Sequence, residues 1–468
     1  MSTPSRVRKP SVRHTFIGLA LLESMAMFSC LFLGINVYSD QSTNFVDHLA
    51  CLECITFVLI VTLSMAAMGL YHARQRDESR EQLARLFISF GLASVAQAVI
   101  FYFIPYLNIE PTAIILALSL SFIIVCLIRY SFITISGTAL IKRKILVLGA
   151  GEKANIIEQR MRRSNDRRGF KLLGYIPLGD RENNNIHQHQ LVDVDLDNLQ
   201  HYAELHRVDE LVVAADQRRG ALPMDELYRC RVAGIHVTDI ASFIERECGK
   251  IPLNLLNPSW VIYSRGYRTN DLFVKALKRI FDVLISLVML ALTLPLMIIT
   301  ALLIMIESGP RTPVFYWQER VGLGGLPFRI YKFRSMRVDA EAGGAVWAKQ
   351  NDDRVTVVGA FIRKYRIDEL PQLLNVFTGD MSFIGPRPER PEFVESLTEQ
   401  IPYYGDRHMV KPGLTGWAQV CYSYGGSTDD AIEKLQYDLY YIKNFSFLLD
   451  TIIMIETIEV VLFGKGAR

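Results

Sequence analysis

The amino-acid sequence predicts a membrane protein in which a bundle of α-helices is followed by α/β structure. Half of its 468 residues are hydrophobic and its mean hydropathy is +0.20, although 21% of the residues are charged. This composition is typical of apolar membrane segments joined to soluble domains. A short strand pattern with a glycine-rich turn follows at residues 145–151, and a further apolar run follows at residues 280–306.

Apolar stretches near the N-terminus predict four membrane helices, at residues 16–37, 49–70, 83–106 and 112–128. Each approaches the roughly 20 apolar residues that a bilayer requires. The first exceeds a signal-peptide core, and no clear small-residue cleavage site follows it. Lysine and arginine fall on alternate sides of these stretches, which predicts a cytoplasmic N-terminus and a cytoplasmic exit for the segment 1–141. These basic residues are Arg6, Arg8, Lys9, Arg13, Arg74, Arg76, Arg80, Arg85, Arg129, Lys142, Arg143 and Lys144.

The net charge and the cysteines exclude few classes of function. The net charge is +3, and nothing in the sequence indicates a nucleic-acid partner. The seven cysteines form no paired metal pattern, which fits a reduced, cytoplasmic location. Glu23 and Glu53 lie within or beside apolar stretches, where helix packing and a polar pathway are both open interpretations.

The middle of the chain, residues 142–250, predicts a Rossmann-like α/β domain. The strand pattern at residues 145–148 leads into a G-x-G-x-x-A run at residues 149–154 and then into a helical stretch. This order is typical of dinucleotide sites. However, no acidic residue clearly ends the second strand at 171–176, and the Tyr-x-x-x-Lys pair of short-chain dehydrogenases is not seen. We therefore expect a structural or regulatory domain rather than NAD chemistry. Further strands are predicted at residues 210–214 and 235–239.

Residues 251–274 predict a linker, because prolines and a glycine interrupt them. The apolar run at 280–306 is long enough to span a bilayer, but Pro295 lies near its middle. Proline removes a backbone hydrogen bond and bends or breaks a helix. A kinked spanning helix and a helix that enters one leaflet and returns are both open at this point. Gln318 and Arg320, close after this run, are expected to meet phosphates at the membrane surface.

The strongest chemical pattern lies at residues 363–389, where Asp368 and Glu369 are followed by Pro371. Proline is favoured in the first turn of a helix, so we expect the acids where a loop becomes a helix. A helix N-terminus keeps a carboxylate ionised and attracts phosphate. Adjacent helical residues point in different directions, which predicts different roles for the two acids. An ordinary helix start with surface ion pairs is the alternative. The basic residues nearby, which suggest an anionic substrate, are Arg363, Lys364, Arg366, Arg387 and Arg390.

Several blocks in the last part of the chain resemble the bacterial sugar transferases that start glycan assembly on a lipid carrier, the monotopic phosphoglycosyl transferases. In the family's order they are KFRSM at 332–336, DELPQLLNV at 368–376, GDMSFIGPRPE at 379–389, VKPGLTGWAQ at 410–419 and YDLYY at 437–441. Long ordered blocks are more specific than a short motif. The resemblance covers residues 275–468, the predicted catalytic domain. The preceding helices and Rossmann-like domain are similar to the long members of the family, which initiate exopolysaccharide, O-antigen or capsule synthesis.

The resemblance implies a mixed α/β monotopic phosphoglycosyl transferase domain with a re-entrant membrane helix at 280–306, broken at Pro295. Because nucleotide sugars are cytoplasmic, a spanning run would place the catalytic residues on the opposite side from their substrate. Lysine and arginine flank the run on both sides, which agrees with a return to the same side. The implied location is the bacterial inner membrane, with the lipid bilayer as a partner and the catalytic domain in the cytoplasm.

The resemblance also implies transfer of a sugar-1-phosphate from a UDP-sugar to undecaprenyl phosphate, with release of UMP. Asp368 would attack the phosphorus and form a covalent intermediate, and Glu369 would bind Mg²⁺. At residues 421–426 the chain has CYSYGG where many small members have Asn-Gly-Arg, so sugar selectivity cannot be carried over. The residues expected to bind substrate or phosphate are Lys332, Arg334, Arg366, Pro386, Arg387, Pro388, Arg407, Lys411 and Asp438.

Two other functions stay open from the sequence. A membrane-anchored nucleotide-binding regulator or scaffold would have an inactive transferase domain, against which the intact Asp368-Glu369 pair argues. An NAD-dependent epimerase or dehydratase would need the tyrosine and lysine that are not seen. A homodimer, formed through the membrane helices or the middle domain, is consistent with the sequence.

Overall fold

The computed structural model divides the chain into two compact units, residues 1–247 and residues 248–468. The described residues are 12–38, 48–68, 70–71, 79–105, 109–136, 142–161, 167, 169–178, 186–216, 222–256, 266–267, 271–338, 353–422, 425 and 427–463. Predictions for the N-terminal basic segment, most of the basic loop after the second helix, and residues 423, 424 and 426 lie outside this description.

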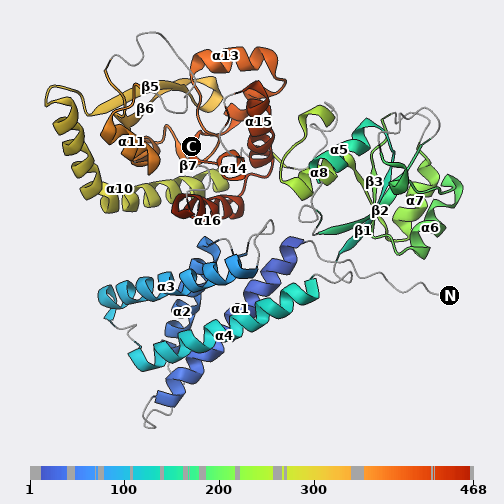
Figure 1. Ribbon diagram of the computed structural model, residues 1–468, viewed down its shortest axis with the longest axis horizontal. Helices are drawn as coiled ribbons and strands as arrows, with labels where there is room; N and C mark the ends of the chain where they lie inside the picture. The colour runs from blue at the N-terminus through green and yellow to red at the C-terminus, as the bar shows by residue number, and fades with distance from the viewer. Residues whose placement is uncertain are drawn as a thin grey trace. The chain divides into compact units, whose positions relative to one another are not determined.

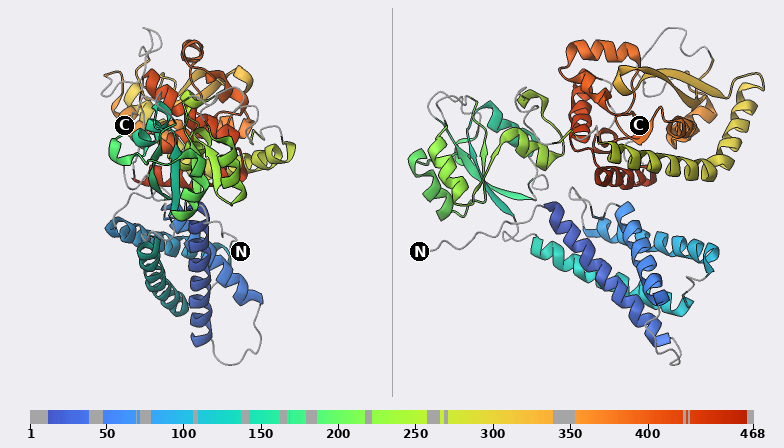
Figure 2. Two further views of the ribbon diagram at one scale, coloured as in Figure 1. Left: turned by 90° about the vertical axis from the view of Figure 1, so that its right-hand side faces the viewer. Right: turned by 180° about the vertical axis from the view of Figure 1, so that it is seen from behind.

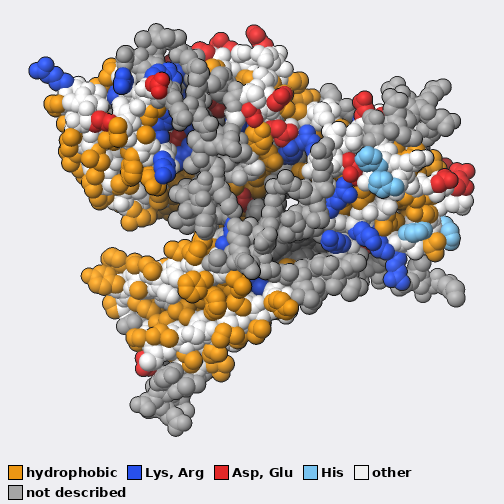
Figure 3. Space-filling model, viewed as in Figure 1, with side chains coloured by type: hydrophobic (Ala, Val, Ile, Leu, Met, Phe, Trp, Pro, Cys, Tyr) orange, Lys and Arg blue, Asp and Glu red, His pale blue; other side chains and the backbone are white. Residues whose placement is uncertain are grey.

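Four long helices form the first part of the N-terminal unit, as predicted (Figures 1 and 2). Among the described residues, α1, α3 and α4 contain apolar stretches long enough to cross a bilayer, while the apolar stretch of α2, Leu52–Ala67, is shorter. Hydrophobic side chains cover the visible face of these helices (Figure 3). The helices are α1 (Val12–Tyr38), α2 (His48–Ala67), α3 (Ser79–Phe103) and α4 (Pro111–Ser136).

A buried ion pair joins the first and last of these helices. Arg129 of α4 contacts both carboxylate oxygens of Glu23 in α1, at 2.8 and 2.9 Å, and Tyr71 donates a hydrogen bond to the same carboxylate at 2.6 Å. Glu23 is fully buried. A buried charge is tolerated when it is paired and hydrogen-bonded, so these contacts favour the helix-packing interpretation of Glu23.

A four-stranded parallel sheet follows in the same unit, with strand order β2-β1-β3-β4. Its four strands agree with the predicted positions, and this order is typical of half of a doubly wound fold. The two central strands, β1 and β3, are largely buried, as expected where helices cover a parallel sheet on both faces, whereas β4 at one edge is partly exposed. The elements are β1 (Arg143–Leu148), α5 (Glu152–Arg160), β2 (Phe170–Ile176), α6 (Leu199–Leu205), β3 (Glu210–Val213), α7 (Met224–Val232), β4 (His236–Asp239) and α8 (Ile240–Cys248).

The C-terminal unit begins with a single long helix, α10 (Leu272–Ser308), which contains Pro295. The predicted break is a bend: the helix is continuous in hydrogen-bonding pattern but turns sharply along its length (Figure 1). A proline bends a helix by removing one bond and crowding the preceding turn. Near the start of α10, Lys278 pairs with Asp450 at 2.6 Å, and Asp282 accepts from the Phe383 amide at 2.9 Å. These contacts attach the helix to the folded domain.

An antiparallel hairpin and a set of short helices surround the predicted acids. Residues 322–325 form the hairpin turn between β5 and β6. Near the end of α10, Glu307 accepts hydrogen bonds from the first amides of α11, Val357 and Val358. The elements are β5 (Phe315–Val321), β6 (Pro327–Phe333), α11 (Val357–Lys364), α12 (Gln372–Thr378), β7 (Ser382–Ile384), α13 (Pro391–Gln400), β8 (Gly413–Thr415), α14 (Trp417–Cys421), α15 (Thr428–Lys443) and α16 (Phe447–Phe463).

The core of this unit lies between α15, α16 and the short parallel pair β7–β8. Leu449 and Ile453 of α16 are buried in it, so the last helix packs against the domain. Tyr441, also buried, donates a hydrogen bond to Asp450 at 2.8 Å. The domain is thus closed on one side by helices that also hold the base of α10.

Candidate active site

Asp368 and Glu369 lie in one tight turn between two helices, as the proline pattern predicted. α11 ends at Lys364, Arg366 adopts a left-handed conformation with φ of 59°, and a 3-10 turn follows at Ile367–Glu369. Pro371 then caps α12. A non-glycine residue in the left-handed region is uncommon and reverses the chain direction sharply. This turn places the two acids side by side at the beginning of α12.

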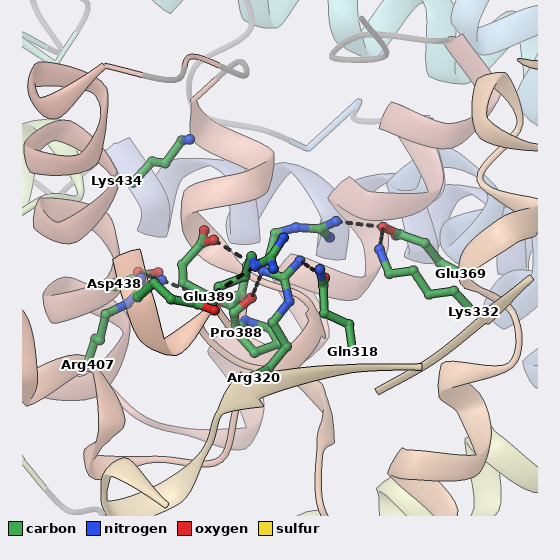
Figure 4. Close-up of polar contacts among 12 residues, drawn as sticks. Gln318, Arg320, Lys332, Glu369, Pro388, Glu389, Arg407, Lys434 and Asp438 are labelled. Carbon is green, nitrogen blue, oxygen red and sulfur yellow. Dashed lines mark hydrogen bonds and ion pairs between the residues drawn. The ribbon is translucent and has the colours of Figure 1, made fainter. Parts of the chain in front are cut away.

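Glu369 is surrounded by cationic side chains (Figure 4). Its Oε1 atom lies 2.6 Å from Arg387, 3.2 Å from Lys332 and 3.8 Å from Arg366. Burial alone would raise the pKa of Glu369, but Arg387 and Lys332 lower it well below its usual range. Three of the predicted basic residues therefore meet one carboxylate, whose ionised form they favour.

Asp368 behaves differently from its neighbour. The side chain is 9% exposed. Burial raises the pKa of Asp368 and the charge of Glu369 raises it further, against the opposing effect of Lys332. A helix N-terminus favours the ionised form of a carboxylate, but at Asp368 desolvation and the like charge of Glu369 outweigh that effect and shift the pKa upward. The two acids thus have different electrostatic environments, and the prediction that they have different roles stays a prediction.

Arg407 and Asp438 lie behind the Pro386-Arg387-Pro388 loop. Arg407 is 7% exposed and donates hydrogen bonds to the backbone oxygen of Arg387 at 2.9 Å, to Asp438 at 2.8 Å and to the Tyr404 hydroxyl at 2.7 Å. Burial raises the pKa of Asp438 to about 6 despite the neighbouring guanidinium. Arg407 therefore supports the loop that carries Arg387, and its contact with phosphate stays a prediction.

Two other predicted phosphate ligands are not brought to the acids. Arg334 donates to the backbone oxygen of Pro313 at 2.9 Å and lies over the Tyr316 ring. Lys411 donates to the backbone oxygen of Gly379 at 2.6 Å, beyond the far end of α12. Both residues were expected to bind phosphate, but in the fold their side chains contact two different backbone segments.

The structure adds residues that the sequence patterns did not identify. Asn375 is 1% exposed, accepts from the Tyr331 amide at 3.1 Å and donates to the Arg329 oxygen at 2.7 Å. It thereby fixes α12 against β6, the strand that carries Lys332. Arg279 of α10 donates to two backbone oxygens at the end of α12, both at 2.7 Å. The sequence signal for the Asn375 contacts is its polar amide within the apolar run LLNVF, because a buried polar group needs hydrogen-bond partners.

The residues present fit a Mg²⁺ ion only together with a substrate. Among the described residues, no three His, Cys, Asp or Glu side chains are grouped to hold a metal. Mg²⁺ is commonly bound by one or two carboxylates, substrate phosphates and water. The adjacent acids supply that number of carboxylates, and the described cationic contacts of Glu369 all use Oε1.

In the N-terminal unit, the carboxylate of Asp216 is bound at the glycine-rich turn. Asp216, which follows β3, accepts hydrogen bonds from the Glu152 and Lys153 amides at 2.9 and 3.0 Å. A Cβ at Gly151 would lie 1.9 Å from an Asp216 oxygen, so the glycine admits this carboxylate. These are the helix N-terminal amides that bind phosphate in dinucleotide folds. Their occupation agrees with the expectation of a non-redox domain.

The bacterial sugar transferase family model matches residues 273–464. A UDP-N-acetylgalactosamine-undecaprenyl-phosphate N-acetylgalactosaminephosphotransferase of Aeromonas hydrophila is 46% identical over 242 residues, 52% of this chain and 56% of that protein. The match thus spans little more than half of that relative. A putative undecaprenyl-phosphate N-acetylgalactosaminyl 1-phosphate transferase of Bacillus subtilis (strain 168) is 54% identical over 132 residues, 28% of this chain and 73% of that protein. An undecaprenyl-phosphate glucose phosphotransferase of Komagataeibacter xylinus is 32% identical over 351 residues, 73% of this chain and 63% of that protein.

Proposed function

Because this chain belongs to the bacterial sugar transferase family, we propose that it transfers a sugar-1-phosphate from a UDP-sugar to undecaprenyl phosphate and releases UMP. The observation that carries the proposal is the arrangement of one buried acid, Asp368, beside an ionised acid held by Lys332 and Arg387. Two phosphates must approach each other in this reaction, and cationic groups offset their repulsion.

The reaction balances as two displacements at one phosphorus. An Asp368 oxygen attacks the phosphorus that carries the sugar, the bond to the UMP oxygen breaks, and UMP leaves with the electron pair. An oxygen of undecaprenyl phosphate then attacks the same phosphorus and Asp368 leaves as a carboxylate. A carboxylate nucleophile divides a difficult transfer into two easier steps. Asp368 must be ionised to attack, and Lys332, Arg366 and Arg363 favour that form.

We propose that Arg387 and Lys332 hold phosphate oxygens, which is supported by their contacts with the same carboxylate oxygen of Glu369. Mg²⁺, held by Glu369 and substrate phosphates, would supply further charge neutralisation when bound. Removal of divalent cations is expected to reduce turnover and to be reversed by added Mg²⁺. Turnover that EDTA leaves unchanged would contradict the metal proposal without touching the role of Asp368.

The membrane arrangement follows from the same reaction. We propose that α10 enters the inner leaflet and returns at its bend, so that the domain stays on the cytoplasmic side of the bacterial inner membrane. The bend and the polar contacts of Lys278 and Asp282 at its base support a helix attached to one side. Cysteine labelling in intact spheroplasts tests this arrangement: substitutions at Asp271 and Thr312 should both be protected from an impermeant reagent. Labelling of Thr312 alone would indicate a spanning helix.

UMP release from a panel of UDP-sugars tests the function directly. The purified full chain is mixed with undecaprenyl phosphate and Mg²⁺, beside Asp368→Asn and the control Asp380→Asn, an exposed acid of the same domain. UDP-N-acetylgalactosamine is tested first, because two relatives named for this sugar match well, and UDP-glucose second. Release that Asp368→Asn abolishes and Asp380→Asn retains supports the proposal. Folded protein that releases no UMP from any donor would favour the scaffold alternative.

A further inference from the structure

We propose that Arg320 is a positioning residue that holds the Pro386–Glu389 loop so that the Arg387 side chain reaches Glu369. Arg320 lies on β5 and contacts the loop from the hairpin side, whereas Arg407 contacts it from the α15 side (Figure 4). The inference rests on the proposed transfer reaction for its consequence, but its geometry is independent of the donor.

Every backbone oxygen of this short loop receives a hydrogen bond from another element. Two of the four loop residues are prolines, which have no amide to donate, so the loop depends on donors from outside. Two of the four donors are backbone amides and two are guanidinium groups. The pairs are Gly413 amide to Pro386 oxygen at 2.9 Å, Arg407 to Arg387 oxygen at 2.9 Å, Arg320 to Pro388 oxygen at 3.2 Å, and Val321 amide to Glu389 oxygen at 2.9 Å.

Arg320 makes these contacts from a largely enclosed position. Its side chain is 17% exposed, and besides the Pro388 oxygen it contacts the Gln318 amide oxygen at 2.6 Å and Glu389 at 3.4 Å. Burial lowers the pKa of Arg320; the charge of Glu389 opposes this shift, and the charges of Arg387 and Arg390 add to it. Burying a charge is unfavourable unless the charge is paired and hydrogen-bonded, and the contacts with Pro388, Gln318 and Glu389 meet that condition for Arg320.

A guanidinium suits this task and an ammonium does not. Arg320 uses one nitrogen for the loop and another for Gln318, and its planar fork holds both directions at once. Lysine has one nitrogen on a flexible stem, so it would retain the charge but not the geometry. Arg320→Lys and Arg320→Gln are therefore both expected to release the loop, whereas a simple charge effect would spare the lysine variant.

The matched control is Arg329, an exposed arginine on the other strand of the same hairpin, stacked on Trp317. We expect Arg329→Gln to keep the wild-type rate of UMP release. Arg320→Lys and Arg320→Gln are expected to lower kcat by roughly tenfold to a hundredfold, the range for a misplaced binding group. The KM for the UDP-sugar should change less than kcat if the Arg387 contact strengthens in the transition state.

A double-mutant cycle separates positioning from general structural damage. If Arg320 acts through Arg387, Arg320→Gln should add nothing in an Arg387→Gln background, since the contact is already lost. Losses that multiply in the double variant would overturn the inference, as would Arg320 variants with the activity of Arg329→Gln. Wild-type protein that releases no UMP would defeat the proposed function instead. In that case a structure of Arg320→Gln decides: an unchanged Arg387–Glu369 contact overturns the inference, and a displaced loop supports it.

Discussion

Two carboxylates of this protein occupy positions where phosphate could bind, and they are held in opposite ways. Asp216 accepts hydrogen bonds from two backbone amides at the start of α5. Glu369 is held by the side chains of Lys332 and Arg387. Backbone amides are fixed by the helix that they begin, whereas lysine and arginine side chains can turn toward another anion.

The amides that bind Asp216 are fixed in place, whereas the side chains that bind Glu369 can change their partner. In the Rossmann-like part, the anion position is filled by the chain, and the glycine that admits a phosphate in related folds admits Asp216 instead. In the sugar transferase part, Glu369 keeps Lys332 and Arg387 close to the position where we propose that a substrate phosphate binds. The carboxylate contacts thus support the fold in the first unit, and we propose that they serve the reaction in the second.

Exchanging each carboxylate for its amide gives the largest expected contrast. Glu369→Gln removes the charge that gathers Arg387 and Lys332, so we expect UMP release to fall by about a hundredfold or more. Asp216→Asn is expected to leave the rate within about twofold, because its contacts lie in the other unit. The test is the rate of UMP release, measured for both variants on folded protein. Equal losses in Glu369→Gln and Asp216→Asn would contradict the different roles of the two carboxylates.

The pH profile sharpens the role of the cations around Asp368. Lys332 lowers the pKa of Asp368, so Lys332→Met should raise that pKa further. The attacking carboxylate must be deprotonated; as its pKa rises, the acid limb of kcat/KM therefore moves to higher pH. Turnover near neutral pH is expected to fall by roughly tenfold. Lys364→Met, which removes an exposed lysine of α11, is the control, and a limb that stays in place in Lys332→Met would contradict the assignment.

Loss of the Asp216 contact should appear in stability. Asp216→Ala removes an acceptor from two amides, which is expected to cost about 1–3 kcal/mol. The apparent Tm of the full chain, followed by scanning fluorimetry, should fall, while Asp225→Asn, an exposed acid of α7, should change it little. We also expect no NADH binding by the wild-type chain, and a titration that shows saturable binding would contradict the filled-turn interpretation.

The smallest effect is expected at Lys153, the cation of the same turn. Its ammonium group donates to the backbone oxygens of Ala215 and Asp216 at 2.9 and 3.0 Å. Because the group is partly solvated, Lys153→Met is expected to cost only about 0.5–1.5 kcal/mol. A loss larger than that of Asp216→Ala, measured in the same assay, would place the main support of the turn on the lysine rather than on the carboxylate.

Much of the fold could be predicted from the sequence because its patterns are local. Apolar runs gave α1 to α4, and the strand–turn–helix pattern gave β1 and α5 close to their observed bounds. The position of Asp368 and Glu369 at the beginning of a helix was predicted because proline is favoured in the first turn of a helix. Arg387, which the sequence groups with the basic residues near the acids, contacts Glu369, and so does Lys332, which lies outside that group and was expected as a substrate ligand.

The directions of individual side chains could not be predicted in the same way. Lys411 lies within the VKPGLTGWAQ block and Arg407 just before it, but packing brings their side chains to the backbone oxygens of Gly379 and Arg387. Asp216 lies more than sixty residues from Gly151 in the chain, and no periodicity links them. Such contacts depend on how separate elements meet, which composition and spacing do not specify.

The hydrogen bonds from α11 to Glu307 have a consequence for regulation by lipid. Glu307 lies in the last turn of the apolar helix α10, and α11 leads into the turn with Asp368. If α10 enters the membrane as we propose, a change in hydrocarbon thickness that tilts it is expected to reach Asp368 through α11, which is joined to α10 by Glu307 and by the apolar cluster that contains Ile304 and Ile362. In nanodiscs of increasing acyl-chain length, turnover should pass through an optimum, and Glu307→Gln should flatten that dependence. The bilayer would then act as an effector of the reaction as well as its support.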